Sequence, residues 1–321
     1  MLTHTRIPRQ ARPRKYTPPM WRQRGARLTL VAACLAVGLE VGARHALGLG
    51  DPPLYRSHPT IDYLLAPDQT CRPFGNRFEV NAYGMRSDPF PARKTRRDEL
   101  RVLVFGDSVT NGGSLIDQGD LATQRAAEAL RSRLRRPVVV GNVSGGGWGP
   151  ANWLAYTEEF GLLDADATLL VVNAGDAAHA PARSPEAADL ATRKPFLAST
   201  HGLRYLRLAL VGRSRPAGPT VSALPALDAL LRRLAAESRV ALLLHPLRSE
   251  LEDGKPAGGA GRIRSLAEAR GVAVVELAPF YAGAALDDLY RDAIHPTSLG
   301  QQRIGRALAE TIAALLSASA L

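Results

Sequence analysis

The first pattern along the chain is an alternation of short apolar runs with longer amphipathic stretches, which begins at Arg101. Short runs that are apolar throughout are typical of strands buried on both faces, as in a parallel sheet. Five such runs predict strands over residues 102–105, 138–141, 168–172, 240–244 and 272–276. The alternation of strands with helical stretches favours an α/β fold, in which helices cover a parallel sheet.

Helices are predicted where apolar residues recur at spacings of three and four positions. The clearest of these stretches are residues 120–135, 224–237, 261–270 and 298–317. Thr297 immediately precedes the last of them and is a natural N-cap, because its hydroxyl can accept a hydrogen bond from the first turn. We therefore expect a single domain over residues 101–321, which is long enough for one catalytic core.

Two segments do not follow this alternation. Residues 177–222 are rich in Ala, Pro and Arg, and we expect them to form an insertion or a lid over the carboxyl edge of the sheet. Residues 50–100 contain many prolines and isolated aromatic residues with little periodicity of either kind. We interpret them as a stem that packs onto the domain.

A longer apolar run precedes the stem and covers residues 28–49. A helix of about 22 residues rises about 33 Å, which is enough to cross the hydrocarbon core of a bilayer. Glu40 and Arg44 interrupt the run, but their i, i+4 spacing lets them pair near its far end, where long side chains also reach the interface. The run predicts a transmembrane signal anchor.

Charge predicts the orientation of this anchor. The chain has a formal net charge of +11, and residues 1–27 hold eight basic residues and no acidic one. A basic tail of this kind stays in the cytoplasm, so the residues after the anchor are expected to be exported, in the periplasm or outside the cell. The rest of the chain has no basic stripe interleaved with aromatic residues, so a nucleic-acid partner is not expected.

The apolar run leaves two alternatives open, a cleaved signal peptide and a lipoprotein processed at Cys34. Only six residues separate Arg27 from Cys34, fewer than the roughly 7 to 15 apolar residues that a signal peptide usually has.

Cys34 and Cys71 are the only cysteines, too few for a disulfide framework or a four-cysteine zinc site. We therefore expect no metal and no cofactor.

The candidate chemistry begins where the first strand runs into Gly106-Asp107-Ser108, because sites in α/β proteins lie at the carboxyl ends of strands. A serine hydroxyl becomes a nucleophile only beside a base that a third group orients. Asp292-Ala293-Ile294-His295-Pro296 supplies such a pair just before the last helix. The three-residue separation lets Asp292 reach Nδ1 of His295 while Nε2 faces Ser108.

These two blocks resemble the first and last signature blocks of the SGNH hydrolases, the GDSL-like family of esterases and lipases, in a membrane-anchored bacterial form. The resemblance implies a three-layer α/β/α fold with a five-stranded parallel sheet of flavodoxin-like order. It also implies that a glycine amide after the second strand helps to form an oxyanion hole. In the segment 142–149, Gly147 takes that position.

The third block of the family, Gly-x-Asn-Asp, reads Asn173-Ala174-Gly175-Asp176 here, with glycine in the place of the oxyanion asparagine. Losing one oxyanion donor costs serine hydrolases on the order of 100- to 1000-fold in turnover. Asn173 lies two residues earlier and can replace the missing donor if the strand ends in a bulge. Alternatively, the backbone amides of Ser108 and Gly147 suffice.

The resemblance implies a serine esterase that uses Ser108, His295 and Asp292, and by analogy it removes acetyl or other short acyl groups from envelope carbohydrate or lipid. Two alternatives remain. The same triad serves an O-acyltransferase if a sugar hydroxyl resolves the acyl-enzyme. The second alternative is a carbohydrate-binding or assembly protein that keeps the fold with impaired turnover, and Gly175 is the best indication of it. His245, after the fourth strand, is interpreted as structural.

Overall fold

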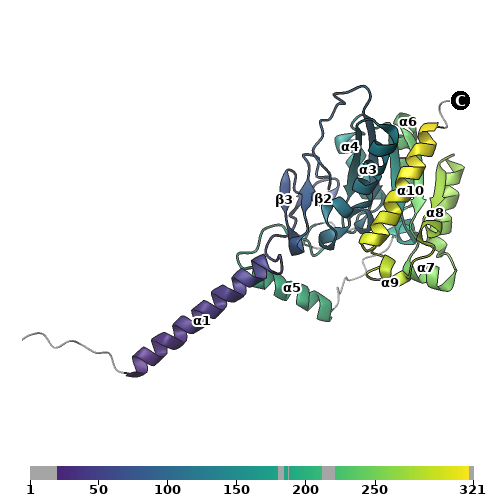
Figure 1. The fold of residues 1–321 in the computed structure, drawn as a ribbon. Coiled ribbons are helices and arrows are strands. Elements are labelled where there is room, and N and C mark those ends of the chain that lie inside the picture. The colour runs from purple at the N-terminus through teal and green to yellow at the C-terminus, as the bar shows by residue number, and fades with distance from the viewer. Residues whose placement is uncertain (1–19, 180–183, 187, 212–220, 318–321) are drawn as a thin grey trace, which may run out of the picture.

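The computed structural model describes residues 20–179, 184–186, 188–211 and 221–317. Figure 1 shows one α/β domain from which a long N-terminal helix, α1 (Met20–His45), projects. A second helix, α5 (Ala198–Val211), lies beside the junction of α1 with the domain. Most of helix α1 therefore lies outside the α/β domain.

A five-stranded parallel sheet forms the centre of the domain, in the order β11, β10, β7, β5, β6. Its strands are β5 (Leu100–Gly106), β6 (Val138–Ser144), β7 (Ala167–Val172), β10 (Arg239–Leu244) and β11 (Ala273–Glu276). The first strand of the sheet lies between the second and the third, which is the flavodoxin-like order. The predicted fold class and sheet order are confirmed.

Helices cover both faces of the sheet (Figure 1). One face carries α3 (Ala122–Leu134) and α10 (Ser298–Ser317), and the other carries α4 (Pro150–Phe160), α6 (Leu224–Glu237) and α8 (Gly258–Ala269). Alternate residues of β5 supply the two cores: Val102 and Val104 pack toward α3 and α10, whereas Leu103 and Phe105 pack on the opposite face. This alternation follows from the two-residue period of a strand.

The predicted helices are present with small shifts at their ends. Helix α10 begins at Ser298 as predicted, and the Thr297 hydroxyl accepts a hydrogen bond from the Gly300 amide at 3.2 Å. Helix α4 was not predicted. The shorter helices are α2 (Ser108–Asn111), α7 (Arg248–Asp253) and α9 (Leu286–Leu289), and the 3₁₀ turns are η1 (Pro73–Gly75), η2 (Gly113–Leu115), η3 (Gln118–Asp120), η4 (Ala174–Ala177) and η5 (Ala278–Tyr281).

Residues 50–100 form two small antiparallel hairpins that pack on the domain. Their strands are β1 (Tyr55–His58), β2 (Asp62–Leu65), β3 (Gln69–Cys71) and β4 (Phe78–Val80). Tyr63, Leu64 and Phe78 are buried in the same apolar core as Trp148 and Trp153 of the domain. The hairpins are thus integrated into the core rather than attached loosely to it.

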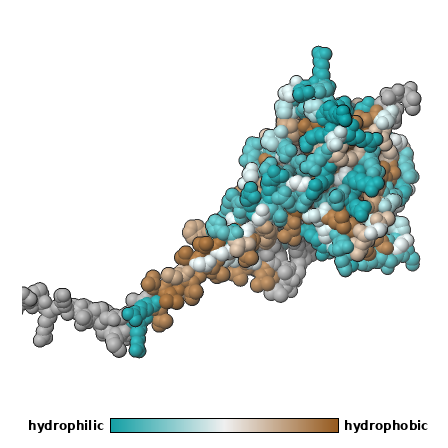
Figure 2. All heavy atoms as spheres, in the orientation of Figure 1, coloured by the Kyte–Doolittle hydropathy of each residue, from teal (hydrophilic) through white to brown (hydrophobic). Residues whose placement is uncertain are grey.

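Helix α1 is long and apolar enough to cross a membrane by its length and composition, over Arg27–His45. Its apolar side chains are exposed along most of its length, and Figure 2 shows them as a continuous hydrophobic surface outside the domain. Soluble proteins rarely expose contiguous apolar surface of this extent. An apolar N-terminal helix is therefore present where the sequence predicts one.

The predicted insertion over residues 177–222 contains β8 (Ala178–His179), which pairs with β9 (Val221–Ser222), and helix α5. Helix α5 packs against α1, at the base of the domain. Residues 180–183, 187 and 212–220 of this segment lie outside the described residues. The described helix of the insertion is thus associated with the N-terminal helix.

Candidate active site

Ser108 lies at the point where β5 gives way to helix α2. A Cβ atom at Gly106 would lie 2.0 Å from the Thr110 hydroxyl oxygen, so only glycine fits the end of the strand. The Asp107 carboxylate accepts a hydrogen bond from the Val109 amide at 2.8 Å and caps α2. As the first residue of the helix, Ser108 keeps an N–H that has no acceptor inside the helix.

The structure brings the three side chains of the two sequence blocks together. The Nε2 atom of His295 lies 2.9 Å from Oγ of Ser108, and Nδ1 of His295 lies 2.7 Å from Oδ2 of Asp292. With the Nδ1 proton donated to the carboxylate, Nε2 is free to accept the Ser108 proton. The 187 residues that separate Ser108 from His295 are thus bridged by one hydrogen bond.

The surroundings of Asp292 favour its charged form. Burial raises the pKa of this carboxyl, but hydrogen bonds from the backbone amides of His295 and Ile294 and from the His295 ring outweigh it, so the pKa is lowered. A carboxylate that is ionised near neutral pH stabilises a protonated imidazole. The pair can therefore take up a proton from a serine hydroxyl.

Buried side chains support the loop that carries His295. Nε2 of His245 lies 2.8 Å from the Ile294 carbonyl oxygen, to which it donates, and Nδ1 lies 2.8 Å from the Tyr281 hydroxyl, from which it accepts. Burial, opposed in part by the bond to Ile294, lowers the pKa of His245 to about 4, so the ring is neutral at pH 7. Arg291 adds a bridge, because its guanidinium donates to the carbonyls of Pro296 and Gly112.

Gly147 lies in a tight turn after β6. The Trp148 amide donates to the Gly145 carbonyl at 3.1 Å, and Gly147 has φ = 82°, which favours glycine. The Tyr63 hydroxyl donates to the Gly146 carbonyl at 2.6 Å, so a stem residue holds the turn. No hydrogen-bond acceptor for the Gly147 amide is found within the described part of the chain.

Asn173 contacts Asp107, the residue before Ser108, and its side chain is already engaged. The Nδ2 group donates to Asp107 and to Asp176, each at 3.1 Å, and Oδ1 accepts from the Gly175 amide at 2.8 Å. Burial, with a contribution from the neighbouring Asp107, raises the pKa of Asp176 well above its usual range. Burial also raises the pKa of Asp107. The Asn173 side-chain amide thus lies between two buried carboxyl groups and donates to both.

Sequence reasoning missed Arg86, a buried residue of the stem. Its guanidinium donates to the carbonyls of Asn111 at 2.6 Å, Gly113 at 2.8 Å and Ile116 at 2.6 Å, and it stacks on the Phe78 ring. Burial lowers its pKa to about 9, which still leaves it charged at pH 7. Arg86 therefore fixes the loop that follows Ser108. No periodicity or family motif marks this residue in the sequence.

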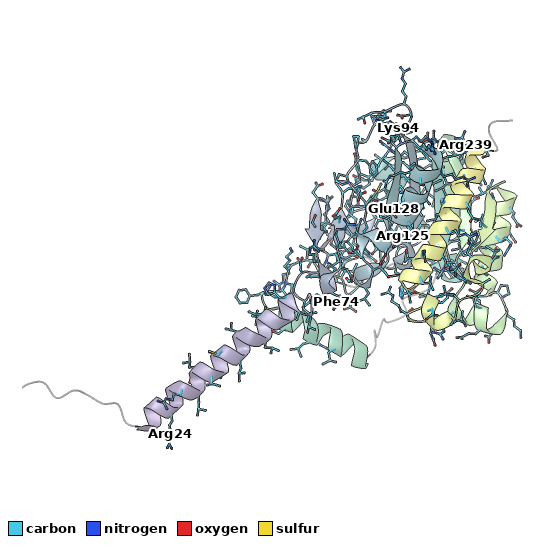
Figure 3. All side chains as sticks on the ribbon, in the orientation of Figure 1. Arg24, Phe74, Lys94, Arg125, Glu128 and Arg239 are labelled. Atoms are coloured by element: carbon cyan, nitrogen blue, oxygen red, sulfur yellow. The ribbon has the colours of Figure 1, made fainter. Side chains whose placement is uncertain are left out.

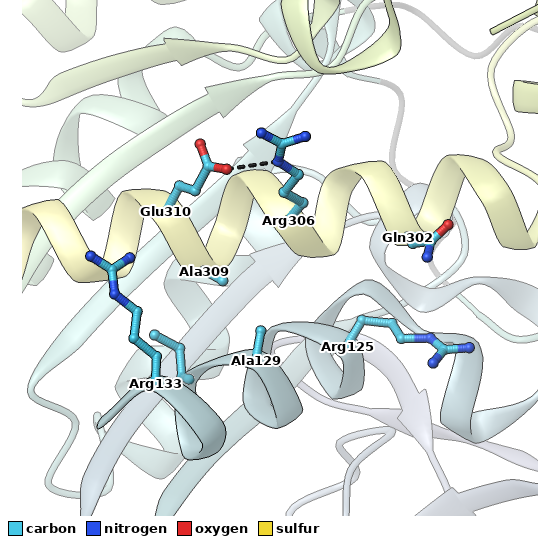
Figure 4. A pocket seen from close by; sticks show the side chains of 8 residues that line it. Arg125, Ala129, Arg133, Gln302, Arg306, Ala309 and Glu310 are labelled. Carbon is cyan, nitrogen blue, oxygen red and sulfur yellow. Dashed lines mark hydrogen bonds and ion pairs between the residues drawn. The ribbon is translucent and has the colours of Figure 1, made fainter. Parts of the chain in front are cut away.

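A hollow of about 320 Å³ between α3 and α10 lies away from Ser108 and His295 (Figure 4). The stems and head groups of Arg125, Arg133 and Arg306 line it, and Arg306 pairs with Glu310 at 2.7 Å. Among the described residues there is no cluster of three His, Cys, Asp or Glu side chains able to hold a metal ion. The residues that line this hollow include none of Ser108, Asp292 and His295.

The family comparison identifies the class of this protein as the serine hydrolases that act on ester bonds. The chain belongs to the GDSL-like lipase/acylhydrolase family, whose sequence profile matches residues 104–303. Comparison with curated proteins finds no match. The sequence resemblance to this family is therefore confirmed by the profile.

The comparison with solved structures gives several matches. LAE5, an alpha/beta hydrolase enzyme from the metagenome of Lake Arreo, Spain, is 17% identical, with a TM-score of 0.44 over 67% of this chain and 96% of that one. A variant of Axe2, an acetyl xylan esterase from Geobacillus stearothermophilus, is 15% identical, with a TM-score of 0.44 over 66% and 93%. The lipase/acylhydrolase from Enterococcus faecalis is 16% identical, with a TM-score of 0.43 over 66% and 95%.

Proposed function

We propose that Ser108, His295 and Asp292 form the catalytic triad of a serine esterase. The observation that carries the proposal is the continuous pair of hydrogen bonds from the Ser108 hydroxyl through the His295 ring to the Asp292 carboxylate, 2.9 Å and 2.7 Å long. Nε2 of His295 removes the serine proton as Oγ attacks the ester carbonyl carbon. The resulting imidazolium returns the proton to the leaving alcohol, and water then resolves the acyl-enzyme by the same route.

The oxyanion hole of the proposed mechanism consists of the backbone amides of Ser108 and Gly147. Both amides lie at the carboxyl edge of the sheet, in segments held by buried side chains. Asn173 is the third proposed donor. It reaches an oxyanion by releasing its contact with Asp107 or Asp176, because both carboxyl groups now accept from its amide. The proposal therefore assigns Asn173 a contribution only after rearrangement around the bound substrate.

The substrates proposed are short acyl esters, with acetyl groups foremost, on carbohydrate or lipid of the cell envelope. The catalytic His295 and Asp292 side chains are partly exposed, so an ester on a large molecule can approach them. An O-acyltransferase is the second candidate, since the same exposure admits an acceptor hydroxyl in place of water. The third is a carbohydrate-binding or assembly protein, favoured by the glycine at position 175.

Helix α1 is proposed to anchor the enzyme as a single membrane span. The apolar helix is exposed over Arg27–His45, and basic residues flank its N-terminal end, where Arg24 is visible in Figure 3. Since basic flanks stay on the cytoplasmic side, the catalytic domain is proposed to lie on the exported side. A membrane-impermeant thiol reagent tests this orientation at an exposed site such as Glu268→Cys: labelling of intact spheroplasts supports export, and labelling only after lysis contradicts it.

The catalytic proposal is tested with p-nitrophenyl acetate and a fluorophosphonate probe on the purified full chain. Wild type is expected to hydrolyse the ester and to be labelled, and Ser108→Ala to do neither. Ser114→Ala is the matched control, because Ser114 lies in the same loop without contacting His295. If wild type is neither active nor labelled, the hydrolase proposal is wrong and the binding protein is favoured. Acyl transfer to an added oligosaccharide in excess of acetate release would favour the transferase.

A further inference from the structure

Several exposed large apolar side chains outside α1 lie on α5 or directly before it. The exposed fractions are 91% for Phe196, 64% for Leu203 and 54% for Leu206. Leu203 and Leu206 are spaced i, i+3 and so share a face of the helix, while Ala198 and His201 are buried on another. Helix α5 is therefore amphipathic, with an apolar face that no described part of the chain covers.

The start of α5 is fixed to α1 by charged groups. The Glu40 carboxylate accepts from the Ala198 amide at 2.7 Å and from the Ser199 amide at 3.1 Å, so a residue of α1 caps the N-terminus of α5. Arg44 pairs with Glu40 at 2.7 Å and donates to the Phe196 carbonyl at 2.6 Å. The two charges that interrupt the apolar run thus serve to attach α5.

The domain holds the same helix from the other side. Nδ1 of His201 accepts from the Gly50 amide at 3.0 Å, just after α1 ends. A Cβ atom at Gly202 would lie 3.0 Å from a methyl group of Leu49, so α5 packs closely on this junction. Helix α5 runs across the direction of α1 in Figure 1. If α1 crosses a bilayer, α5 lies along the surface of that bilayer.

Charge around α5 suits an anionic surface. Residues 190–211 contain four basic residues and no acidic one, and Arg207 on the helix is exposed. Helices that lie in a membrane interface combine an apolar face with Arg and Lys in this way. Helix α5 packs against α1, whose apolar side chains are exposed outside the domain in Figure 2.

The catalytic edge of the domain is close to this junction. The Phe74 amide donates to the Gly48 carbonyl at 2.8 Å, and the Asn76 side chain donates to the Ser114 carbonyl at 3.0 Å, which links the end of α1 to the loop after Ser108. Figure 3 shows Phe74 at the junction and Lys94 at the opposite end of the domain. A surface that binds α5 therefore faces the same side of the domain as the loop after Ser108.

We propose that Phe196, Leu203 and Leu206 form a second membrane-binding element, which docks on the outer surface of the anionic bilayer that α1 spans. The docking fixes the rotation of the domain, so that the edge bearing Ser108 is held toward the lipid surface. This inference rests on the proposed anchor and not on the proposed esterase activity. It assigns to the insertion a role in orienting the domain.

The test uses the full chain in lipid nanodiscs that contain phosphatidylglycerol, with an environment-sensitive fluorophore on one cysteine. Cys71 is buried, so the native Cys34 reports on α1, and Phe196→Cys or Leu203→Cys in a Cys34→Ala background reports on α5. Glu268→Cys on α8 is the matched control. We expect the α5 labels to shift to the blue and to lose emission to a lipid quencher placed near the head groups, with no such change at position 268.

Each outcome bears on one part of the reasoning. If the Cys34 label is quenched near the bilayer centre while the α5 labels behave like the control, the anchor stands and the docking inference fails. If the α5 labels are shielded from an aqueous quencher but not reached by the lipid quencher, a second copy of the chain covers α5 and the inference fails. If Cys34 is not quenched at all, the anchor proposal itself is wrong. Ester hydrolysis by the same samples tests the esterase proposal separately, because none of these fluorescence outcomes depends on it.

Discussion

Lowering the pH should weaken the domain through His245, which stays neutral between the fourth strand and the His295 loop. Burial holds the pKa of His245 at about 4 in the folded state, against 6.5 for the ordinary side chain. Below pH 6.5 the unfolded chain therefore binds a proton that the folded chain does not, and stability falls as the pH falls. The difference corresponds to about 3 kcal/mol in full and to about 2 kcal/mol at pH 5.

Other buried groups titrate in the opposite sense. Because burial raises the pKa values of Asp107 and Asp176, their contributions strengthen as the pH falls and are lost as it rises. The contribution of His245 is therefore isolated as a difference between wild type and His245→Gln. Glutamine keeps a donor for the Ile294 carbonyl but cannot be protonated.

The measurement is urea unfolding of both proteins in the same detergent, followed by the fluorescence of the buried Trp148 and Trp153. At pH 8 wild type should be the more stable of the two, because the variant loses the fit of the ring and its contact with Tyr281. Between pH 8 and pH 5 this gap should shrink by about 2 kcal/mol. A gap that stays constant over that range would refute the assignment of a depressed pKa to His245.

Three further substitutions test the site. Asp292→Asn should lower kcat about 10⁴-fold while leaving the folded state intact, because the amide favours the wrong tautomer of His295; an unchanged kcat would exclude the triad. Arg86→Lys should lower kcat and the free energy of unfolding, the latter by about 2 to 4 kcal/mol, because one ammonium group cannot donate to all three carbonyls in the same geometry. Equal unfolding midpoints for the variant and wild type would contradict this. Gly175→Asn should raise kcat above that of Gly175→Ala if the oxyanion hole lacks a donor, and equal values would show that the proposed hole needs no donor at position 175.

The sheet was predictable because each of its strands contains a short, largely apolar run. Residues 102–105 and 168–172 were expected as strands, and β5 and β7 cover them with one or two residues more at an end. The strand order came from the family resemblance, since periodicity shows whether a strand is buried but not which strand lies beside it. Helix α4, which begins at Pro150, was missed because a glycine-rich loop precedes it and its N-cap, Gly149, has no polar side chain.

The candidate site was predictable where a motif places its residues side by side in sequence or at strand ends. The separation of Asp292 and His295 is local, so the contact between them follows from the loop itself. The direction of the Asn173 side chain is not local, because it depends on Asp107, which lies 66 residues away. The stem gave no signal at all, since strands of three or four residues are too short to show a period.

The role of Arg86 has a consequence for where this enzyme can be cut or fused. The family profile begins at residue 104, whereas the guanidinium that satisfies the carbonyls after Ser108 comes from residue 86. A graft of residues 104–303 onto a foreign anchor would leave those buried carbonyls without donors. The smallest portable unit of this enzyme thus has to include the part of the stem that carries Arg86, well before the motif by which its family is recognised.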